Sequence, residues 1–322
     1  MSDPKPVFSI GNIPVYGDLV LAPMDGVSDA PYRALIRRMG SAMSTTEFVN
    51  TLELFRRKQA LLNNLTFEPF ERPFSVQLLD SEPERMVAAA KIIYEVINPD
   101  LFDINFGCPD RRVTYRGAGS ALMRDPNLVT TIVRQLKAAV PVPITAKIRL
   151  GWDNDSRNYM EIAKIIEAEG AQMLAIHGRT TKQGYRGHAN WEPIAEVKAA
   201  LKIPVLGNGD VNTVVDISRI KAETNCDAVM IGRAAIANPW IFARKDRHEI
   251  PPEIVQPFMH KQLDAMLGIS EFAGIRRFRK YAKAYLEPYA IPREPLHALL
   301  ICTEAQEFKD QLDRIFDDFV LN

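Results

Sequence analysis

Cysteine is scarce in this 322-residue sequence. Cys108, Cys226 and Cys302 are the three that occur, widely separated along the chain. An odd number at these spacings gives neither a disulfide framework nor the paired ligand spacing of a metal site, and no H-x-x-H pair supplements it. We therefore expect no bound metal and a reducing, cytoplasmic environment.

A net charge is also missing, because 40 lysines and arginines balance 40 aspartates and glutamates. The composition gives no general attraction to nucleic acid or to an anionic membrane. A site for a polyanion would have to be local. Four basic clusters are candidates, although a solvated helix face is the more common interpretation of each: residues 37–38, 56–58, 111–116 and 276–283.

Long apolar runs are absent too. The first ten residues, MSDPKPVFSI, lack the basic and then apolar segments of a secretory leader, and no later run approaches the length that spans a membrane. We expect a soluble, unexported protein that makes no membrane contact and is a monomer.

Strand and helix patterns alternate regularly through most of the chain. Apolar runs bounded by turn residues predict eight strands: 19–24, 42–48, 74–79, 101–107, 144–150, 173–178, 204–210 and 228–233. Apolar residues at three- and four-residue spacing predict helices between them: 30–39, 82–96, 128–140, 159–169, 191–201 and 213–222. Eight such units match a (β/α)₈ TIM barrel, with an open doubly wound sheet as the alternative.

The positions of the polar residues favour the closed barrel. Nearly every predicted strand ends in polar or reactive side chains: Met24 with Asp25, Glu47, Gln77, Asn105 with Cys108, Lys147 with Arg149, His177, Asn208 with Asp210, and Gly232 with Arg233. A closed barrel brings the carboxyl ends of all its strands to one mouth, where the active sites of this fold lie. An open sheet would not gather all eight.

An all-helical region follows the barrel. Strand patterns vanish after Ala243, and Pro251, Pro252 and Pro257 mark a junction. Amphipathic segments then predict a small helical bundle: 253–267, 272–286, 296–304 and 308–319. We expect a catalytic barrel over residues 1–243 and a helical domain over residues 244–322.

The stretch from Leu101 to Met123 is the predicted chemical centre. A buried strand runs into a loop that carries Cys108 directly after the strand ends. The segment that follows is basic and rich in glycine, which favours a mobile lid over a ligand rather than a part of the core.

Two glycine-bearing turns follow the last two predicted strands, GNGD at 207–210 and IGRAA at 231–235. In barrels the loops at these positions commonly hold a phosphate, because glycines let backbone N–H groups approach it. Arg233 would add a charge-assisted contact. Either turn alone could be an ordinary strand-to-helix connection, but the pair favours phosphate.

Lys147 and His177, at two further strand ends, have several interpretations. Lys147 could be a Schiff-base lysine, a hydrogen-bond donor to an electron-rich cofactor ring or a structural ion-pair partner. His177 could be a ligand, a general acid or a barrel histidine with satisfied hydrogen bonds. These alternatives stay open on the residues alone.

The sequence resembles the flavin-dependent tRNA-dihydrouridine synthases. The matching strings occur in family order and cover essentially the whole barrel: LAPMDGVSD, TEFV, SVQLL, INFGCPDRRVTYRGAGSALM, AKIRLGWD, IHGRTTKQGYRG, GNGDV and DAVMIGRAAIANPWIF. A helical C-terminal domain is also typical of the family.

The resemblance implies that FMN binds in the barrel mouth. It places Pro23, Met24 and Asp25 beside the isoalloxazine ring, Gln77 and Lys147 in hydrogen bonds to it, and His177 along it. The ribityl phosphate would be held by residues of the two glycine turns: Asn208, Gly209, Asp210, Gly232 and Arg233. The substrate would be contacted by Asn105, Arg149, Arg179, Tyr185 and Arg186.

Cys108 corresponds to the family's proton donor. Reduced flavin would deliver hydride to C6 of uracil while the thiol gives a proton to C5, so the thiol should have an ordinary or raised pKa, with Arg111 and Arg112 directed away from its sulfur. The target base must be extruded from folded tRNA. RNA phosphates would contact basic clusters such as 276–283, and NADPH would supply the electrons.

Three other functions stay open. A flavin barrel that acts on a small pyrimidine, similar to dihydroorotate dehydrogenase, is the nearest alternative, although the helical region and its basic stretch count against it. A Schiff-base aldolase would be colourless. An RNA-binding relative without activity would not need Cys108 or Lys147, both of which are present.

Overall fold

The computed structural model describes residues 5–63, 65–268 and 270–321. The chain forms two compact units, one ending at Gly232 and the other beginning at Arg233. Within the described ranges, no helix combines the length and the apolar character that crossing a membrane requires.

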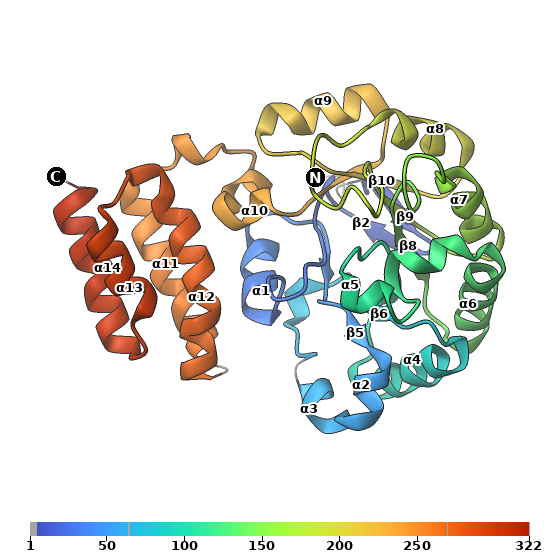
Figure 1. The fold of residues 1–322 in the computed structure, drawn as a ribbon, viewed down its shortest axis with the longest axis horizontal. Coiled ribbons are helices and arrows are strands. Elements are labelled where there is room, and N and C mark those ends of the chain that lie inside the picture. Colours follow the sequence, from blue (N-terminus) through green and yellow to red (C-terminus); the bar gives the residue numbers. More distant parts are fainter. Residues whose placement is uncertain (1–4, 64, 269, 322) are drawn as a thin grey trace. The chain divides into compact units, whose positions relative to one another are not determined.

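The first unit is built around a parallel barrel, as predicted (Figure 1). Its strands are β3 (Leu19–Leu21), β4 (Ser44–Thr45), β5 (Val49–Asn50), β6 (Phe74–Leu79), β7 (Leu101–Phe106), β8 (Ile144–Ile148), β9 (Leu174–His177), β10 (Val205–Asn208) and β11 (Ala228–Ile231). They are hydrogen-bonded in the order β3-β11-β10-β9-β8-β7-β6-β4, with β5 beside β6. The amide of Ala42 donates to the carbonyl of Leu19 (2.8 Å) across the remaining gap, so the barrel is nearly closed.

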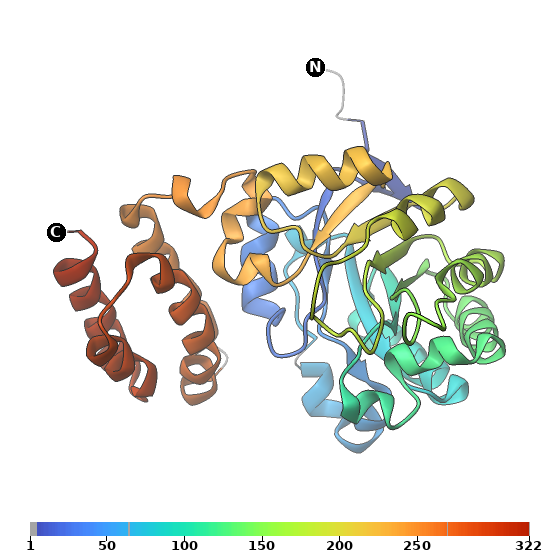
Figure 2. The ribbon, with the colours of Figure 1, turned by 45° about the horizontal axis from the view of Figure 1, so that its top comes forward.

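Helices cover the outside of the barrel, and Figure 2 shows the strands enclosed by them. The helices of this unit are α1 (Ala30–Arg38), α2 (Thr51–Arg56), α3 (Lys58–Asn63), α4 (Pro83–Ile97), α5 (Arg111–Thr114), α6 (Pro126–Ala139), α7 (Tyr159–Ala168), α8 (Glu192–Ala200) and α9 (Val214–Thr224), with 3₁₀ turns η1 (Pro69–Glu71) and η2 (Gly119–Arg124). In α6 the buried residues Val129, Ile132, Val133 and Leu136 recur every three or four positions. This spacing turns one apolar face toward the sheet.

Local sequence fixes where several helices begin and end. The carboxylate of Asp29 accepts a hydrogen bond from the amide of Tyr32 at the start of α1, and Thr213 and Asp216 form a capping box at the start of α9. Asn98 and Asn225 end α4 and α9 with positive φ. Asparagine tolerates that conformation better than most residues, so these helices stop where predicted to within two residues.

A short hairpin precedes the barrel and was not predicted. Its strands β1 (Phe8–Ile10) and β2 (Ile13–Val15) pair in antiparallel fashion around Gly11, which has a φ of +59°. Phe8, Ile10 and Val15 are buried with apolar residues from inside the barrel, including Val20 and Leu206. The hairpin therefore helps to fill the barrel interior.

The second unit is helical, as predicted. Its elements are α10 (Ala234–Ala237), η3 (Pro239–Ala243), η4 (Arg247–Glu249), α11 (Pro252–Leu267), α12 (Glu271–Leu286), η5 (Glu287–Tyr289), α13 (Arg293–Ile301) and α14 (Ala305–Phe319). Its core is aromatic, with edge-to-face contact of Phe278 with Phe308 and stacking of Tyr281 on Tyr285. Pro257 lies inside α11 rather than at a junction. The proposed division at residue 243 falls at the end of η3.

Candidate active site at the barrel mouth

Polar side chains converge where the barrel strands end. The register pairs Gln77 with Asp103, Asn105 with Lys147, and Asn208 with His177 on neighbouring strands. All but Lys147 are buried, and Lys147 is half-buried. Because side chains alternate between the two faces of a strand, the pairs lie on the interior face near the carboxyl ends. The structure therefore gathers these predicted residues at one mouth.

A chain of hydrogen bonds leads from Asp103 to the Cys108 loop. Asp103 accepts from Gln77 Nε2 (2.7 Å), and Gln77 Oε1 accepts from Asn105 Nδ2 (2.8 Å). Asn105 Oδ1 in turn accepts from the amides of Gly107 (3.1 Å) and Cys108 (2.8 Å). The side-chain amides of Gln77 and Asn105 are thus each fixed in one orientation. The second N–H of each amide is not used in this row of hydrogen bonds.

Asp103 was not predicted as a site residue. Besides Gln77, its carboxylate accepts from the hydroxyl of Thr145 (2.6 Å). Burial raises the pKa of Asp103, opposed by these two hydrogen bonds and by the charge of Lys147. The available signal was the alternation of Asp103 and Asn105 along one strand, which places both on the interior face.

Cys108 is half-buried just after β7. Burial raises the pKa of its thiol above the ordinary value, the charges of Asp110 and Asp25 act in the same direction, and Arg149 opposes them. Arg112 lies exposed and donates to the carboxylate of Asp110. The thiol is thus protonated near neutral pH, as the predicted acid role requires.

The segment after Cys108 packs beneath it. Ser120 donates to the carbonyl of Cys108 from both its amide (3.1 Å) and its hydroxyl (2.9 Å). Val113 and Ala118 are buried against Leu79. Helical turns α5 and η2 therefore replace the irregular loop that was expected, and the mobility of this segment stays a prediction.

Lys147 reaches across the mouth from β8. Its ammonium group donates to Asn208 Oδ1 (3.2 Å), and Asn208 Nδ2 donates to the carbonyl of Met230 (2.7 Å). Burial, and then the charge of Arg149, lower the pKa of Lys147 to about 8. At neutral pH it is a cation with N–H groups to spare.

Arg149 and Arg179 were predicted to contact substrate, and both are almost fully buried. Arg149 donates to the carbonyls of Gly107 (2.8 Å), Thr180 (3.0 Å) and Gly184 (2.9 Å). The guanidinium group of Arg149 therefore bonds to the backbone of two loops.

The guanidinium group of Arg179 also has several partners. It pairs with Asp210 (2.6 Å), donates to the carbonyl of Gly187 (2.6 Å) and lies 3.4 Å from His177 Nε2. Asp210 also accepts from the amide of Ala189 (2.7 Å). A buried charge needs such a partner, so this pair fixes the turn after β10 in place.

The turns predicted to hold a phosphate differ in their demand for glycine. Gly209 has a φ of +122°, and an added Cβ would lie 2.8 Å from Ala189 Cβ and 3.0 Å from the His177 ring, so only glycine fits. At Gly232 an added Cβ would make ordinary contact, 3.6 Å from Met24 Sδ. Arg233 follows directly and is exposed.

The remaining predicted residues lie at the rim. Pro23 and Met24 are half-buried after β3, and Asp25 is exposed. The amide of Met24 donates a hydrogen bond to Ser28 Oγ (2.9 Å). Tyr185 and Arg186 are exposed on the loop after β9. These two side chains can meet an incoming molecule.

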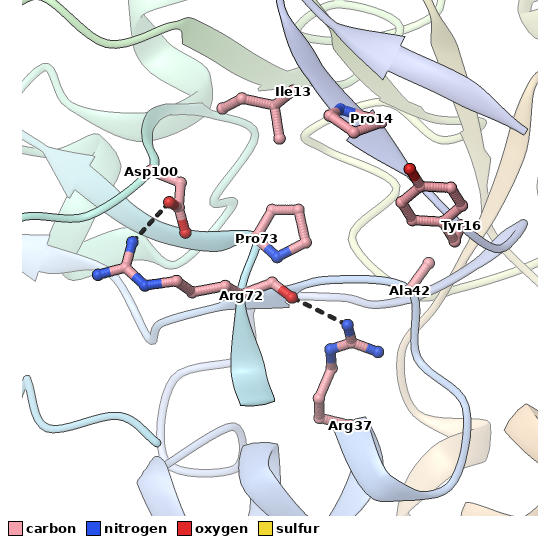
Figure 3. A pocket seen from close by; sticks show the side chains of 8 residues that line it. All are labelled: Ile13, Pro14, Tyr16, Arg37, Ala42, Arg72, Pro73 and Asp100. Carbon is pink, nitrogen blue, oxygen red and sulfur yellow. Dashed lines mark hydrogen bonds and ion pairs between the residues drawn. The ribbon is translucent and has the colours of Figure 1, made fainter. Parts of the chain in front are cut away.

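A pocket of about 240 Å³ lies elsewhere, at the amino-terminal ends of the strands (Figure 3). Its charged groups are paired, with Arg72 bonded to Asp100 (2.5 Å) and Arg37 donating to the carbonyl of Arg72 (2.9 Å). Functional sites of barrels lie at the opposite, carboxyl end. We therefore place the candidate site at the mouth around Cys108.

The fold and the mouth define a TIM-barrel enzyme whose site combines a protonated thiol, fixed amide donors and a half-buried lysine. The family model described as dihydrouridine synthase (Dus) matches residues 20–318. The chain belongs to this dihydrouridine synthase family.

Named relatives agree with this family assignment, and a solved structure has a similar fold. The chain is 37% identical to tRNA-dihydrouridine synthase B of Pseudomonas aeruginosa over 97% of this chain and 92% of that protein. It is 43% identical to tRNA-dihydrouridine synthase B of Xanthomonas campestris over 87% of this chain and 86% of that protein. A solved 2-naphthoyl-CoA reductase complex shares the fold, with a TM-score of 0.56 at 12% identity over 73% of this chain and 51% of that one.

Proposed function

We propose that this protein is an FMN-dependent tRNA-dihydrouridine synthase that uses NADPH as its reductant. The observation that carries the proposal is the half-buried Cys108, a thiol kept protonated at a barrel mouth where N–H donors converge. Family membership supports the reaction, and the donor set supports the cofactor.

The residues at the mouth fit the pyrimidine edge of a flavin. That edge carries carbonyl and ring-nitrogen acceptors. Gln77 has an N–H to offer beyond its bond to Asp103, and Lys147 has N–H groups beyond its bond to Asn208. The positive charge of Lys147 also favours an electron-rich ring. We assign His177 to the side of the ring, and Pro23, Met24 and Asp25 to the rim beside it.

The phosphate of FMN would lie at the turns after β10 and β11. Gly209 and Asp210 form the first turn, whose backbone is held by the Arg179–Asp210 pair. Asn208, Gly232 and Arg233 complete the proposed set. Backbone N–H groups and an exposed guanidinium suit a dianion at such a position.

Cys108 acts as the acid. Bound FMN, once reduced by NADPH, would supply a hydride to C6 of an extruded uracil. Cys108 gives its thiol proton to C5 from the opposite side, so that one hydride and one proton saturate the C5–C6 bond. Asn105 is one residue set to hold the base, because an N–H of its amide stays available beside the thiol loop.

Exposed side chains near the thiol could contact the RNA. Tyr115 is 94% exposed at the end of α5, and Arg111, Arg112 and Arg116 around it are exposed as well. Aromatic rings stack on unpaired bases and arginines contact phosphates. Together with Tyr185 and Arg186, these residues are the proposed RNA contacts of the barrel.

The helical domain is proposed as a second tRNA contact. In its basic stretch Arg276 and Arg277 are exposed on α12, whereas Arg279 donates to the carbonyls of Ile301 and Cys302. Arg279 is therefore structural, whereas Arg276 and Arg277 are proposed to contact phosphates. Residues 1–243 as catalytic domain, residues 244–322 as tRNA-binding domain, a cytoplasmic location and a monomeric state stay predictions.

The test uses FMN-loaded protein reduced by NADPH without oxygen. Adding tRNA that lacks dihydrouridine should reoxidise the flavin and leave dihydrouridine in the product. Cys108→Ala should slow this step by about 10²- to 10⁴-fold while leaving reduction by NADPH unchanged. Cys226→Ala is the matched control, because Cys226 is buried in the same unit, where its sulfur lies beside Gly207 on the side of β10 that faces Ile194 of α8 and Ile220 of α9.

Two results would contradict the proposal. Reoxidation by a free pyrimidine such as orotate but not by tRNA would assign the protein to small-molecule oxidoreductases. Binding of tRNA with no flavin reoxidation, unchanged by Cys108→Ala, would leave an RNA-binding protein without this activity.

A further inference from the structure

Arg149 lies between two loops that sequence separates widely. From the end of β8 its Nε donates to the carbonyl of Gly107 (2.8 Å), the residue directly before Cys108. Its Nη1 donates to the carbonyls of Thr180 (3.0 Å) and Gly184 (2.9 Å) in the loop after β9. One buried guanidinium group therefore joins the thiol loop to the loop that carries Tyr185.

The same guanidinium group lies under the exposed tyrosine. Its central carbon is 5.5 Å from the centre of the Tyr185 ring, close enough for a cation–π contact. Tyr185 is 56% exposed, whereas Arg149 is 2% exposed. The tyrosine thus presents one face outward while the arginine supports it from within.

A second arginine holds the other end of this loop but does not reach the thiol. Arg179 donates to the carbonyls of Arg186 (3.4 Å) and Gly187 (2.6 Å) and pairs with Asp210. The carbonyls of Thr180, Gly184, Arg186 and Gly187 are in this way bonded to two guanidinium groups. The two arginines share one loop, and Arg149 alone bonds to Gly107 as well.

We propose that Arg149 is a positioning residue that couples the proton-donor loop of Cys108 to the loop of Tyr185 and Arg186. The functional consequence rests on the proposed tRNA-dihydrouridine synthase activity: a base held by the second loop meets the thiol at a fixed distance. The planar fork is essential, because three carbonyls on two loops need donors in fixed directions. A lysine ammonium at this position cannot bond all three.

The coupling is tested by two measurements that need no turnover. In the flavin-loaded protein, amide hydrogen exchange is followed in residues 108–119 and 180–187, and alkylation of Cys108 by iodoacetamide is followed by peptide mapping. Arg149→Lys should speed exchange in both segments. It should also raise the alkylation rate about fivefold to tenfold, the equivalent of one lost hydrogen bond.

Two further variants separate coupling from general loosening. Arg179→Lys should speed exchange in 180–187 and leave 108–119 and the alkylation of Cys108 as in wild type. Arg149→Gln, which removes the charge but keeps a donor, should also shift the pH profile of alkylation upward, because Arg149 lowers the pKa of Cys108. Arg149→Lys, which keeps the charge, should not shift it.

The outcomes discriminate between the possibilities. Unchanged exchange in 108–119 for both Arg149 variants would overturn the coupling, and so would an equal rise in that segment for Arg179→Lys. Either result is independent of tRNA. If the wild type fails to make dihydrouridine while the exchange pattern is as expected, the proposed function falls and the coupling stands.

Discussion

Gly119 packs directly against the proposed proton donor, and replacing it with alanine tests that packing. Its φ is +61°, a conformation that costs alanine about 1–2 kcal/mol. An added Cβ would also lie 2.8 Å from the carbonyl oxygen of Cys108, 2.9 Å from Val113 Cγ1 and 3.1 Å from Cys108 Cβ. Real Cβ atoms essentially never show contacts under 3.0 Å, as the first two are, so the thiol loop or Val113 must move.

The size of the effect follows from a matched glycine. Gly184 has the same φ of +61°, and nothing lies within 4 Å of its added Cβ. Gly184→Ala should therefore lose only the backbone term, about 1–2 kcal/mol. Gly119→Ala should lose that plus an overpacking term of about 1–3 kcal/mol. The difference between the two variants isolates the overlap with Cys108.

Urea unfolding of the two variants and wild type in flavin-free form gives the two free-energy changes. Flavin reoxidation by tRNA, measured on the loaded proteins, should fall for Gly119→Ala, because this variant moves the thiol. Equal destabilisation of the two variants would refute the argument from overlap. Displacement of Cys108 would then no longer follow from the structure.

Two other predictions test single charged groups. The folded-state pKa of Lys147 is lowered to about 8, so its ammonium group is present at pH 7 and is lost as pH rises through 8. FMN affinity, measured by fluorescence quenching, should therefore fall above pH 8. Lys147→Met should abolish that pH dependence. The unfolded lysine keeps its proton to higher pH. The contribution of this group to the stability of the flavin-free protein therefore increases as pH rises from about 8 to the ordinary pKa of lysine. Arg33 forms a buried ion pair with Glu71 (2.7 Å); Arg33→Met should cost about 3–5 kcal/mol in thermal unfolding, because Glu71 is left as an uncompensated buried charge, and a loss below 1 kcal/mol would contradict this.

The sequence pattern was sufficient to predict the barrel but not the ends of its strands. Each predicted strand exists, yet most end earlier than predicted, because residues such as Met24 and Gly107 continue the apolar or extended pattern after the hydrogen-bonded ladder has ended. The segment 42–48 was predicted as one strand. The structure has two short strands there, and between them Thr46 Oγ1 accepts a hydrogen bond from the amide of Gln77.

The initial hairpin gave too weak a signal. Its strands have three residues each, shorter than the four to eight over which alternation can be recognised. What makes it stable is the burial of Phe8, Ile10 and Val15 among residues of distant strands. A contact with residues far along the chain leaves no local pattern.

The hydrogen-bond partners of the two buried arginines could not be inferred from residue types, and a substrate contact of Arg149 or Arg179 stays a prediction. An arginine beside a predicted site is a natural candidate for a substrate contact, because its side chain binds anions and bases well. The two arginines donate to the backbone carbonyls of Gly107, Thr180, Gly184 and Gly187, and Arg179 also pairs with Asp210. Every residue has a carbonyl, so an arginine that binds one leaves no complementary residue in the sequence. The guanidinium group that joins two loops becomes visible only when the turns of both loops are known.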